Sequence, residues 1–358
     1  MRAVGVFPGI HEVRLIDHPE PSISSARELK LRMLEVGVCG TDRELCAFRF
    51  GTSPPSCDHF ILGHESLAEV VETGDGVTAI LPGDLVVATV RKPCDDPNCA
   101  PCRSGRQDFC ATSNYRERGI QALHGFMTEY VVEEDRYVYP VPVALRNVAV
   151  LIEPLTIAEK AFLEFRAIDA RLPWRKERRT AVVLGAGPVG LLGAMLLRAA
   201  GFDTWVYSRS RMPNPKAAIV EAIGARYVSS LEVLPRDFAR SAGNIDVVYE
   251  AMGAAQTALD VLQCLGANGV FMFTGVPPLD DALTMDIHRL LRRIIMRNQV
   301  IVGTVNAGPD AFEAAVRDLS AFNERWPSAL AWMITARYPI EAFREAIDGG
   351  GIKNVISM

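Results

Sequence analysis

The sequence lacks the segments that direct a chain to or through a membrane. Its beginning, MRAVGVFPGIHEVRLIDHPEP, has no basic start followed by a long apolar run, so we expect no signal peptide. No stretch reaches about 18 uncharged apolar residues, so we expect no membrane span and no membrane partner. These absences predict a cytoplasmic protein, in a compartment that keeps thiols reduced.

The chain also lacks an excess of positive charge. It has 38 Lys and Arg against 43 Asp and Glu, a formal net charge of −5, which argues against a nucleic-acid partner. We find no internal repeat and no low-complexity tract. With 358 residues, 49% of them hydrophobic, the chain has ample material for a core and a length typical of about two domains.

Cysteine is sparse except in one short segment. The chain has eight cysteines, and KPCDDPNCAPCRSGRQDFC (residues 92–110) holds four of them: Cys94, Cys99, Cys102 and Cys110. A disulfide framework, a reactive thiol pair and a metal site are the alternatives. A reducing compartment disfavours disulfides, and a redox pair needs only two thiols. Four thiolates in a lobe with few apolar residues favour a structural zinc with no open coordination position.

The two parts of the chain have different hydrophobic patterns. Residues 1 to about 150 contain short β-branched runs separated by Gly, Pro and Asp, which predicts an all-β body, a partly closed barrel. From about residue 155, apolar strands alternate with helical segments, which predicts a doubly wound parallel sheet. The run GVFMFTGV (residues 269–276) is one such strand, and we consider it an edge strand for pairing between subunits.

A dinucleotide-binding turn is predicted in the second part. VLGAGPVG fits G-x-G-x-x-G after an apolar strand and before a helix. The three glycines permit the tight turn, the approach of the pyrophosphate and close helix packing, and free N–H groups at the helix start face the phosphates. An ordinary glycine-rich turn is the alternative. The predicted contacts are Gly185, Gly187, Pro188, Val189 and Gly190.

The next strand indicates which dinucleotide binds. An NAD site usually has an acid about 20 residues after the turn. This chain has VYSRSR there, and Asp203 lies too early, at the start of the strand. Ser208, Arg209 and Arg211 suit a 2′-phosphate, so we expect NADP in preference to NAD, with NAD possible. A solvated basic loop is the alternative.

Two further motifs, GVCGTD and LGHES, place Cys39 and the adjacent pair His64 and Glu65 in the first part. Each alone has an ordinary structural explanation. In the order GVCGTD, GHE, the four-cysteine lobe and GAGPVG, the chain resembles the zinc-dependent medium-chain alcohol dehydrogenase family over nearly its whole length. The runs GVCGTDREL, TVRKP, SGRQDFC, RERGI, HGFMTEY and IEPLTIAEKA are most similar to its glucose 1-dehydrogenase branch.

The resemblance implies a fold and a set of domains. The fold class is α/β, with a partly open, GroES-like β-barrel catalytic domain over residues 1–155 and 306–358. A doubly wound parallel Rossmann domain over residues 156–305 interrupts it. The family is commonly tetrameric or dimeric, so we expect a homotetramer or homodimer.

The resemblance also implies site residues. Cys39, His64 and Glu153 would bind a catalytic zinc, with Glu65 exchanging with the zinc-bound water, so that each chain holds two zinc ions. Asp42 would orient the imidazole of His64, and Thr41 would pass the substrate proton outward. Sugar contacts are expected from Glu117, Asn306 and His124, with the polarity of a surface loop as the alternative.

Two positions depart from the family pattern. Four residues separate Cys94 from Cys99 where the family usually has two, which makes Cys94 the least secure ligand of the lobe. Glu44 stands where many alcohol dehydrogenases have a histidine that relays the proton to solvent. The residue that carries the proton outward beyond Thr41 is therefore not assigned.

The expected activity is a hydride transfer from C1 of an aldose, most simply D-glucose giving gluconolactone, to NADP. A polyol, threonine or simple alcohol dehydrogenase of the same family is an alternative substrate class. A metal-depleted reductase or structural member of the fold is the alternative of another class, and the presence of Cys39, His64 and Glu153 argues against it.

Overall fold

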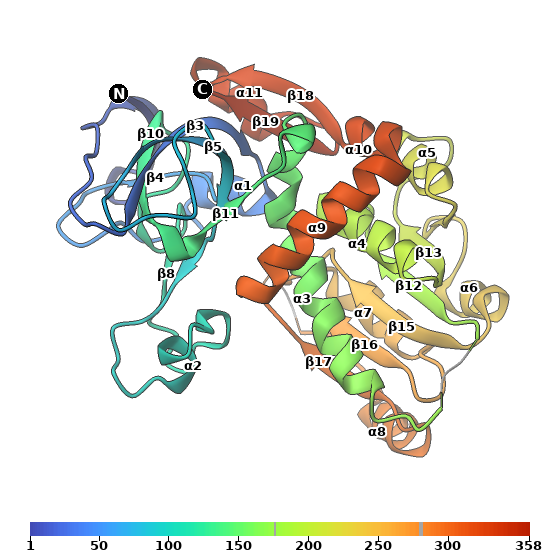
Figure 1. Cartoon of the computed structure of the whole chain (residues 1–358). Helices are drawn as coiled ribbons and strands as arrows, with labels where there is room; N and C mark the ends of the chain where they lie inside the picture. Colours follow the sequence, from blue (N-terminus) through green and yellow to red (C-terminus); the bar gives the residue numbers. More distant parts are fainter. Residues whose placement is uncertain (175–176, 279–281) are drawn as a thin grey trace. The chain divides into compact units, whose positions relative to one another are not determined.

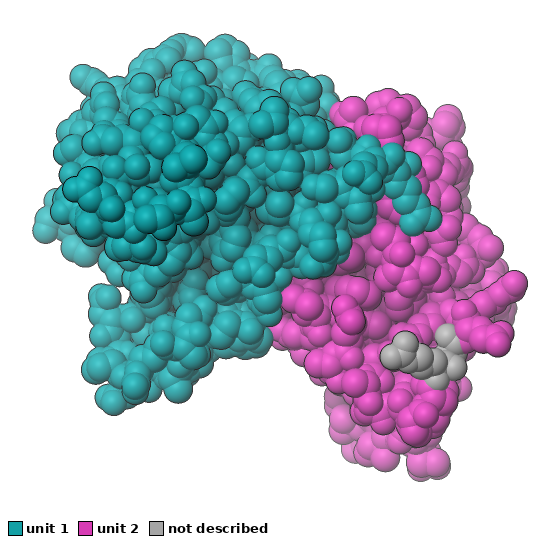
Figure 2. Space-filling model, viewed as in Figure 1, with its two compact units in different colours: residues 1–156, 306–325, 333–358 teal, residues 157–305, 326–332 magenta. Residues whose placement is uncertain are grey.

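The structure, a computed structural model, describes residues 1–174, 177–278 and 282–358, and it divides into two compact units. Unit 1 comprises Met1–Thr156, Asn306–Arg325 and Met333–Met358. Unit 2 comprises Ile157–Val305 and Trp326–Trp332, and Figure 2 shows the two sets of residues in different colours.

Unit 1 is built from mostly antiparallel sheets that form a partly open barrel (Figure 1). The largest has the order β11-β6-β5-β3-β19-β18, with β10 also paired to β3, and two three-stranded sheets have the orders β2-β1-β4 and β7-β8-β9. The last two strands come from the C-terminal end of the chain, and β18 and β19 are parallel to each other. The strands of this unit are β1 (Arg2–Phe7), β2 (Glu12–Asp17), β3 (Glu28–Gly37), β4 (Phe60–Ile61), β5 (Glu65–Thr73), β6 (Leu85–Ala88), β7 (Arg91–Lys92), β8 (Arg116–Arg118), β9 (Ala122–Leu123), β10 (Tyr130–Glu134), β11 (Val138–Pro140), β18 (Ile334–Pro339) and β19 (Lys353–Ser357).

The central strand of this unit is β3, which pairs with β5, β10 and β19. Leu29, Leu31 and Met33 are buried at alternate positions along it, as expected for a strand with one face on a core. The helices of the unit are short apart from α9: they are α1 (Gly40–Cys46), α2 (Ala100–Arg103), α9 (Pro309–Arg325) and α11 (Phe343–Asp348), with 3₁₀ turns at Pro8–Ile10, Gln107–Phe109, Asp135–Tyr137, Val143–Leu145, Ala149–Leu151 and Ile340–Ala342.

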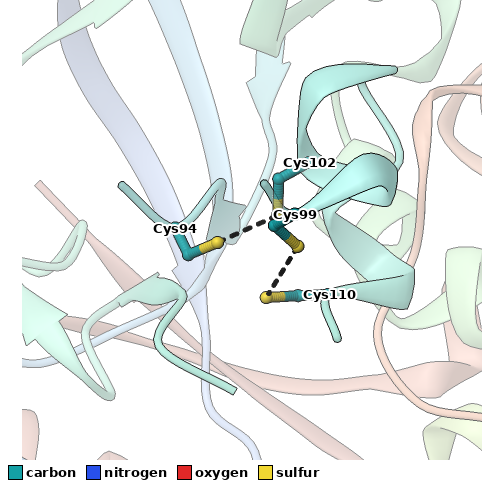
Figure 3. A group of neighbouring side chains, drawn as sticks. All are labelled: Cys94, Cys99, Cys102 and Cys110. Carbon is teal, nitrogen blue, oxygen red and sulfur yellow. Dashed lines mark hydrogen bonds between the residues drawn. The ribbon is translucent and has the colours of Figure 1, made fainter. Parts of the chain in front are cut away.

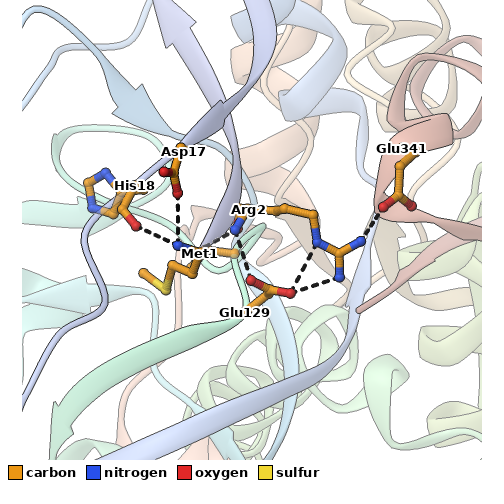
Figure 4. A network of polar contacts seen from close by, with 7 residues as sticks. Met1, Arg2, Asp17, His18, Glu129 and Glu341 are labelled. Carbon is orange, nitrogen blue, oxygen red and sulfur yellow. Dashed lines mark hydrogen bonds and ion pairs between the residues drawn. The ribbon is translucent and has the colours of Figure 1, made fainter.

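Polar contacts attach the N-terminus to two distant segments of unit 1 (Figure 4). The Met1 amino group donates to Asp17 Oδ1 at 3.0 Å and to the His18 carbonyl oxygen at 2.9 Å. The Arg2 guanidinium pairs with Glu129, just before β10, and with Glu341 in the C-terminal segment. The beginning and the end of the sequence therefore meet on one barrel.

Unit 2 is a six-stranded, all-parallel sheet of order β14-β13-β12-β15-β16-β17. One face carries a core in which side chains of α6, α7 and α8 pack on Val182, Tyr207 and their neighbours. Its strands and helices are β12 (Thr180–Leu184), β13 (Asp203–Ser208), β14 (Arg226–Ser229), β15 (Ile245–Glu250), β16 (Val270–Phe273), β17 (Val300–Gly303), α4 (Pro188–Ala199), α5 (Pro215–Ala222), α6 (Pro235–Ala242), α7 (Ala255–Leu262), α8 (Ile287–Met296) and α10 (Pro327–Met333), and α3 (Ile152–Asp169) precedes them.

The strand expected at the sheet edge is an interior one. β16, which lies within residues 269–276, pairs with β15 on one side and with β17 on the other, so the edge interpretation is wrong. Helix α8 and strand β17 were not expected from the sequence, and β17 takes the edge position. None of the helices in the described parts of the chain is long and apolar enough to cross a membrane.

Three glycines allow backbone segments to pack closely beside His64. Gly63 has φ +94°, a conformation that favours glycine, and it lies against Gly119 and Gly125. A Cβ on Gly125 would lie 2.5 Å from the Leu62 carbonyl oxygen and closer still to that of Gly63. Because backbone atoms cannot swing aside as a flexible side chain can, this contact fixes the chain that carries His64.

We expect Gly125→Ala to destabilise the protein by about 1–3 kcal/mol, the usual cost of overpacking a tight site. The measurement is the free energy of unfolding in denaturant. Gly9→Ala is the matched control, because a Cβ on Gly9 meets nothing within 4 Å. Equal stability of the two variants would show that the backbone contact at Gly125 is not tight.

Candidate catalytic and metal sites

The first turn of α1 positions Cys39 and Asp42 toward one another. Cys39 is the N-cap residue, and its sulfur accepts the backbone N–H of Asp42. The Asp42 carboxylate in return accepts the backbone N–H of Cys39, at 2.8 Å. This reciprocal capping satisfies two N–H groups at the helix start. Thr41 lies between them in the same turn, and its side chain is half-buried.

Asp42 also faces His64, which follows β4 and Gly63. His64 Nδ1 lies 3.4 Å from Asp42 Oδ1, and neither atom has another hydrogen-bond partner among the described residues. Nδ1 is therefore directed at the carboxylate, and Nε2 is the nitrogen left to bind a metal. Burial lowers the pKa of His64, but Asp42 and Cys39 outweigh burial and raise it well above its usual value.

Cys39, His64 and Glu65 form a group whose ligand atoms all lie within 4.8 Å of one another. Thiolate, imidazole and carboxylate are the ligands that zinc prefers, so the residues present fit that ion. Cys39 is half-buried, whereas His64 and Glu65 are buried.

Glu65 has a partner that was not expected from the sequence. Lys353 Nζ, on β19, donates to both carboxylate oxygens, at 2.6 Å from Oε1, and it also donates to the carbonyl oxygen of Val38. Gly37 is required beside this pair, because any Cβ there would overlap the Glu65 carboxylate. The signal in the sequence is a single lysine in the largely apolar segment GIKNVISM.

Glu153 lies near this group but outside the 4.8 Å set. It is in the first turn of α3 and is buried. Burial raises its pKa to about 7, and the neighbouring charges of His64, Glu65, Lys353 and Asp42 modify that shift. The structure therefore brings Glu153 within electrostatic range of the residues with which it was predicted to act.

The four cysteines of the lobe converge, and Figure 3 shows their side chains directed toward a common point. Their sulfur atoms all lie within 4.8 Å of one another, with Cys94 to Cys102 at 3.6 Å and Cys99 to Cys110 at 3.9 Å. Four sulfurs at about 2.3 Å from a tetrahedral zinc would be about 3.8 Å apart. The observed spacing fits zinc, and the longer gap before Cys99 does not remove Cys94 from the group.

Two of the three predicted sugar contacts lie together. Asn306 Nδ2 donates to Glu117 Oε1 at 3.1 Å, although the two residues are far apart in sequence. Arg91, which is buried on β7, donates to the same oxygen at 2.9 Å. Glu117 is thus held through one oxygen, and no hydrogen bond to Oε2 is recorded among the described residues. Arg91 was not expected at this site from the sequence.

His124 is placed in a different group. Its ring lies 5.1 Å from that of His18 and 5.6 Å from that of His59, measured between centroids. Its Nδ1 accepts the backbone N–H of Ile61. Burial and the charges of His18, His59 and Arg118 lower its pKa to about 4. This environment differs from that of Glu117 and Asn306.

The glycine-rich turn of unit 2 has the geometry that its spacing predicts. Gly185 has φ +101°, and a Cβ on Gly190 would overlap the Gly185 carbonyl oxygen. Gly187 is the N-cap of α4, with Pro188 in the first turn. The N–H groups of Val189 and Gly190 precede the first backbone hydrogen bond of the helix, from Leu191 to Gly187, and are free for a ligand.

The basic segment after β13 is accessible. Ser208 is the last residue of the strand and is half-buried, and Arg209 and Arg211 are exposed. Neither arginine side chain has an ion-pair partner in the parts of the chain that the structure describes. Asp203 opens the strand, at its other end from Ser208.

Comparison with known proteins agrees with this fold. The family model of the alcohol dehydrogenase GroES-like domain matches residues 25–143, and that of the glucose dehydrogenase C-terminus matches residues 146–358. Glucose 1-dehydrogenase of Methanocella arvoryzae is 38% identical over 98% of this chain and 96% of its own. Glucose 1-dehydrogenase 2 of Vulcanisaeta moutnovskia is 40% identical over 97% of this chain and 95% of its own.

A solved structure matches over the full chain. Haloferax mediterranei glucose dehydrogenase, in complex with NADP, Zn and gluconolactone, superposes with a TM-score of 0.91 and 32% identity, covering 100% of this chain and 99% of its own. The barrel, the parallel sheet and the thiol-containing groups are those of a zinc-dependent medium-chain dehydrogenase. Within that class, the chain belongs to the glucose dehydrogenase family. The fold class and the family predicted from the sequence are confirmed.

We expect Cys102→Ser to remove about one zinc ion per chain and to lower the melting temperature by several degrees. The reason is that the lobe has little apolar surface, so metal binding supplies much of its folding free energy. Cys57→Ser is the control, because Cys57 is exposed and outside the four-cysteine group. Zinc content by mass spectrometry and thermal unfolding are the measurements. An unchanged zinc content and melting temperature would contradict a metal role for the lobe.

Proposed function

We propose that this chain oxidises D-glucose at C1 with NADP and releases gluconolactone. The observation that carries the proposal is the full-length likeness to a glucose dehydrogenase solved with NADP, Zn and gluconolactone, together with a zinc-type ligand group in unit 1 of this chain. The glucose 1-dehydrogenase names of several relatives at 37–40% identity support the same substrate.

In this proposal Cys39, His64 and Glu153 would hold the catalytic zinc, and Glu65 would be a further carboxylate ligand within reach. Zinc, when bound, supplies a Lewis acid that lowers the pKa of the sugar hydroxyl. The chain's own contribution is orientation, because Asp42 fixes the ring of His64 from the Nδ1 side. The four cysteines of the lobe hold a second, structural zinc.

Thr41 accepts the proton of the substrate hydroxyl and passes it toward solvent. Its place in the first turn of α1, between the metal-binding Cys39 and the orienting Asp42, supports this role. A hydroxyl both donates and accepts a hydrogen bond, so it can relay a proton without holding charge.

Glu117 and Asn306 bind hydroxyl groups of the sugar. Asn306 and Arg91 both donate to Oε1 of Glu117, which fixes the carboxylate and leaves Oε2 to accept from a substrate. A sugar that lacks the matching hydroxyl leaves these polar groups unpaired, and this penalty gives the selectivity. His124 is the weaker candidate for a sugar contact, because its ring lies beside those of His18 and His59.

Unit 2 binds the dinucleotide. The N–H groups at the start of α4 contact the pyrophosphate, and Ser208, Arg209 and Arg211 contact the 2′-phosphate of NADP. NADP, when bound, supplies the hydride acceptor. Both arginines are exposed and have no ion-pair partner among the described residues, which supports this assignment because their guanidinium groups can bind an anion.

The assembly and location form a separate part of the proposal. We propose a cytoplasmic homo-oligomer, a dimer or tetramer. None of the eight cysteines is paired in a disulfide, which suits a reducing compartment. The edge strand β17 has an unpaired side within the described chain, and a second copy can extend the sheet there.

The test of the function is the product. We expect zinc-loaded enzyme with NADP and glucose to release gluconolactone or gluconate, identified by mass spectrometry, in a panel that includes galactose, xylose, sorbitol, threonine and ethanol. His64→Ala should lower turnover at least about 100-fold while NADP binding, measured by calorimetry, stays the same, because the glycine-rich turn is in the other unit. Turnover confined to ethanol or threonine would contradict the proposal, and full activity of His64→Ala would contradict its metal site.

Arg209→Ala tests the cofactor assignment. A hydrogen bond from arginine to a charged phosphate is worth about 1.5–3 kcal/mol, and exposure of the segment favours the lower figure, so we expect about a tenfold rise in the KM for NADP. The KM for NAD should stay nearly constant, because NAD has no 2′-phosphate. Arg226→Ala, on the neighbouring strand and paired with Asp203, is the control. Equal weakening of both cofactors by Arg209→Ala would contradict the assignment.

A further inference from the structure

A cavity in unit 2 is lined by three arginines. It has a volume of about 330 Å³ and lies among residues of α6, α7, α8 and their adjoining turns, with Arg236, Arg289 and Arg293 in its wall. These helices pack on the same core of the sheet. The segments that form the cavity are different from the glycine-rich turn and from Ser208–Arg211. We infer that this cavity is an anion site that takes a phosphate dianion, either free phosphate or the phosphate group of a sugar ester.

The charges in the cavity are unbalanced. Three arginines and one acid, Asp260, line it, which gives the lining a formal charge of +2. None of the three arginines has an ion-pair partner in the described parts of the chain, and Asp260 accepts a hydrogen bond from Gln256 instead. Like charges held close together raise the energy of the empty site. A bound dianion would neutralise the excess charge of +2 and so remove this repulsion.

Among the three arginines, Arg293 has the side chain best suited to bind an anion. Its Nε atom is buried and has no hydrogen-bond partner within the described residues. Burial and the positive charges of Arg297 and Arg289 lower its pKa. An arginine in this position presents N–H groups in a fixed fork, which matches two oxygens of a phosphate.

The start of α6 adds positive potential. Leu234 and Pro235 line the cavity, and they are the N-cap and the first residue of this eight-residue helix. Leu234 has no side-chain oxygen to cap the N–H groups there, and the positive end of the helix dipole favours an anion. Arg289 and Arg293 reach the cavity from successive turns of α8, since they are four residues apart.

The size of the cavity limits the ligand. A volume near 330 Å³ is at the lower end of small-molecule sites, and it accommodates phosphate or a small phosphate ester. The excess charge of +2 favours a dianion over a monocarboxylate. Free phosphate and a sugar phosphate ester both present a phosphate dianion, and the experiment below distinguishes between these two ligands.

The experiment uses the full, zinc-loaded protein saturated with NADPH, so that the dinucleotide site is filled. Inorganic phosphate and glucose 6-phosphate are titrated separately by calorimetry, with chloride holding the ionic strength constant. We expect one equivalent of phosphate dianion per chain. Arg293→Gln and Arg289→Gln should each weaken binding about tenfold or more, as expected when one charge-assisted contact is lost.

Arg240→Gln is the matched control, because Arg240 is an exposed arginine of α6 that pairs with Asp237 and does not line the cavity. It should bind the probes as the unmodified protein does. Arg289 is exposed, so its variant keeps the test decisive where Arg293→Gln fails to fold. Tighter binding of glucose 6-phosphate than of phosphate assigns the site to a phosphate ester, and equal or weaker binding assigns it to free phosphate.

Two results would overturn the inference. One is the absence of binding heat for both probes at a single site in the NADPH-saturated protein. The other is binding that Arg240→Gln weakens as much as Arg289→Gln does, which would show screening of a basic surface. Because the readout is binding and not turnover, a negative result here leaves the proposed glucose oxidation untouched.

Discussion

A buried ion pair joins the last strand of the chain to the residues beside its candidate metal site. Lys353 and Glu65 have side chains that are each 2% exposed, and the lysine also donates to the Val38 carbonyl oxygen, one residue before Cys39. Removing either partner would leave a charge without solvent or counter-ion, which usually costs about 3–5 kcal/mol. The position of β19 against β3, the turn at Cys39 and the orientation of Glu65 therefore depend on one another.

This dependence explains which parts of the site could be predicted from the sequence. Motifs in short segments were sufficient to predict the cysteine lobe and the glycine-rich turn, because the geometry of each is set locally. In the lobe it is set by cysteines close together in the sequence, and in the turn by a strand, a turn and a helix that follow one another. The contacts of Glu65 with Lys353, and of Glu117 with Asn306 and Arg91, join residues far apart along the chain. Hydrophobic period and residue spacing carry no information about such pairings. The family resemblance suggested Glu117 and Asn306 as sugar contacts, but not that they bond to each other.

The fold too could be predicted from the sequence in some parts and not in others. The parallel sheet and its helices were predicted because strands of apolar residues alternate with helical segments over residues 180 to 276. Helix α8 was missed because four of its ten residues are His or Arg and its apolar residues Ile287, Leu291 and Ile295 are exposed. The strand β17 was missed with it, and so the edge of the sheet was assigned one strand too early.

Unit 1 is discontinuous, and this has a consequence for the order of folding. Asn306 and Lys353 are synthesised after the whole of Ile157–Val305, so the pairs Glu117–Asn306 and Glu65–Lys353 form only when nearly the entire chain has left the ribosome. The pairing of β19 with β3 spans more than 300 positions, and such long-range contacts form slowly because a large loop must close first. The intervening parallel sheet has all of its strands available earlier. During translation, the dinucleotide-binding part can therefore assemble while the barrel still lacks its last two strands.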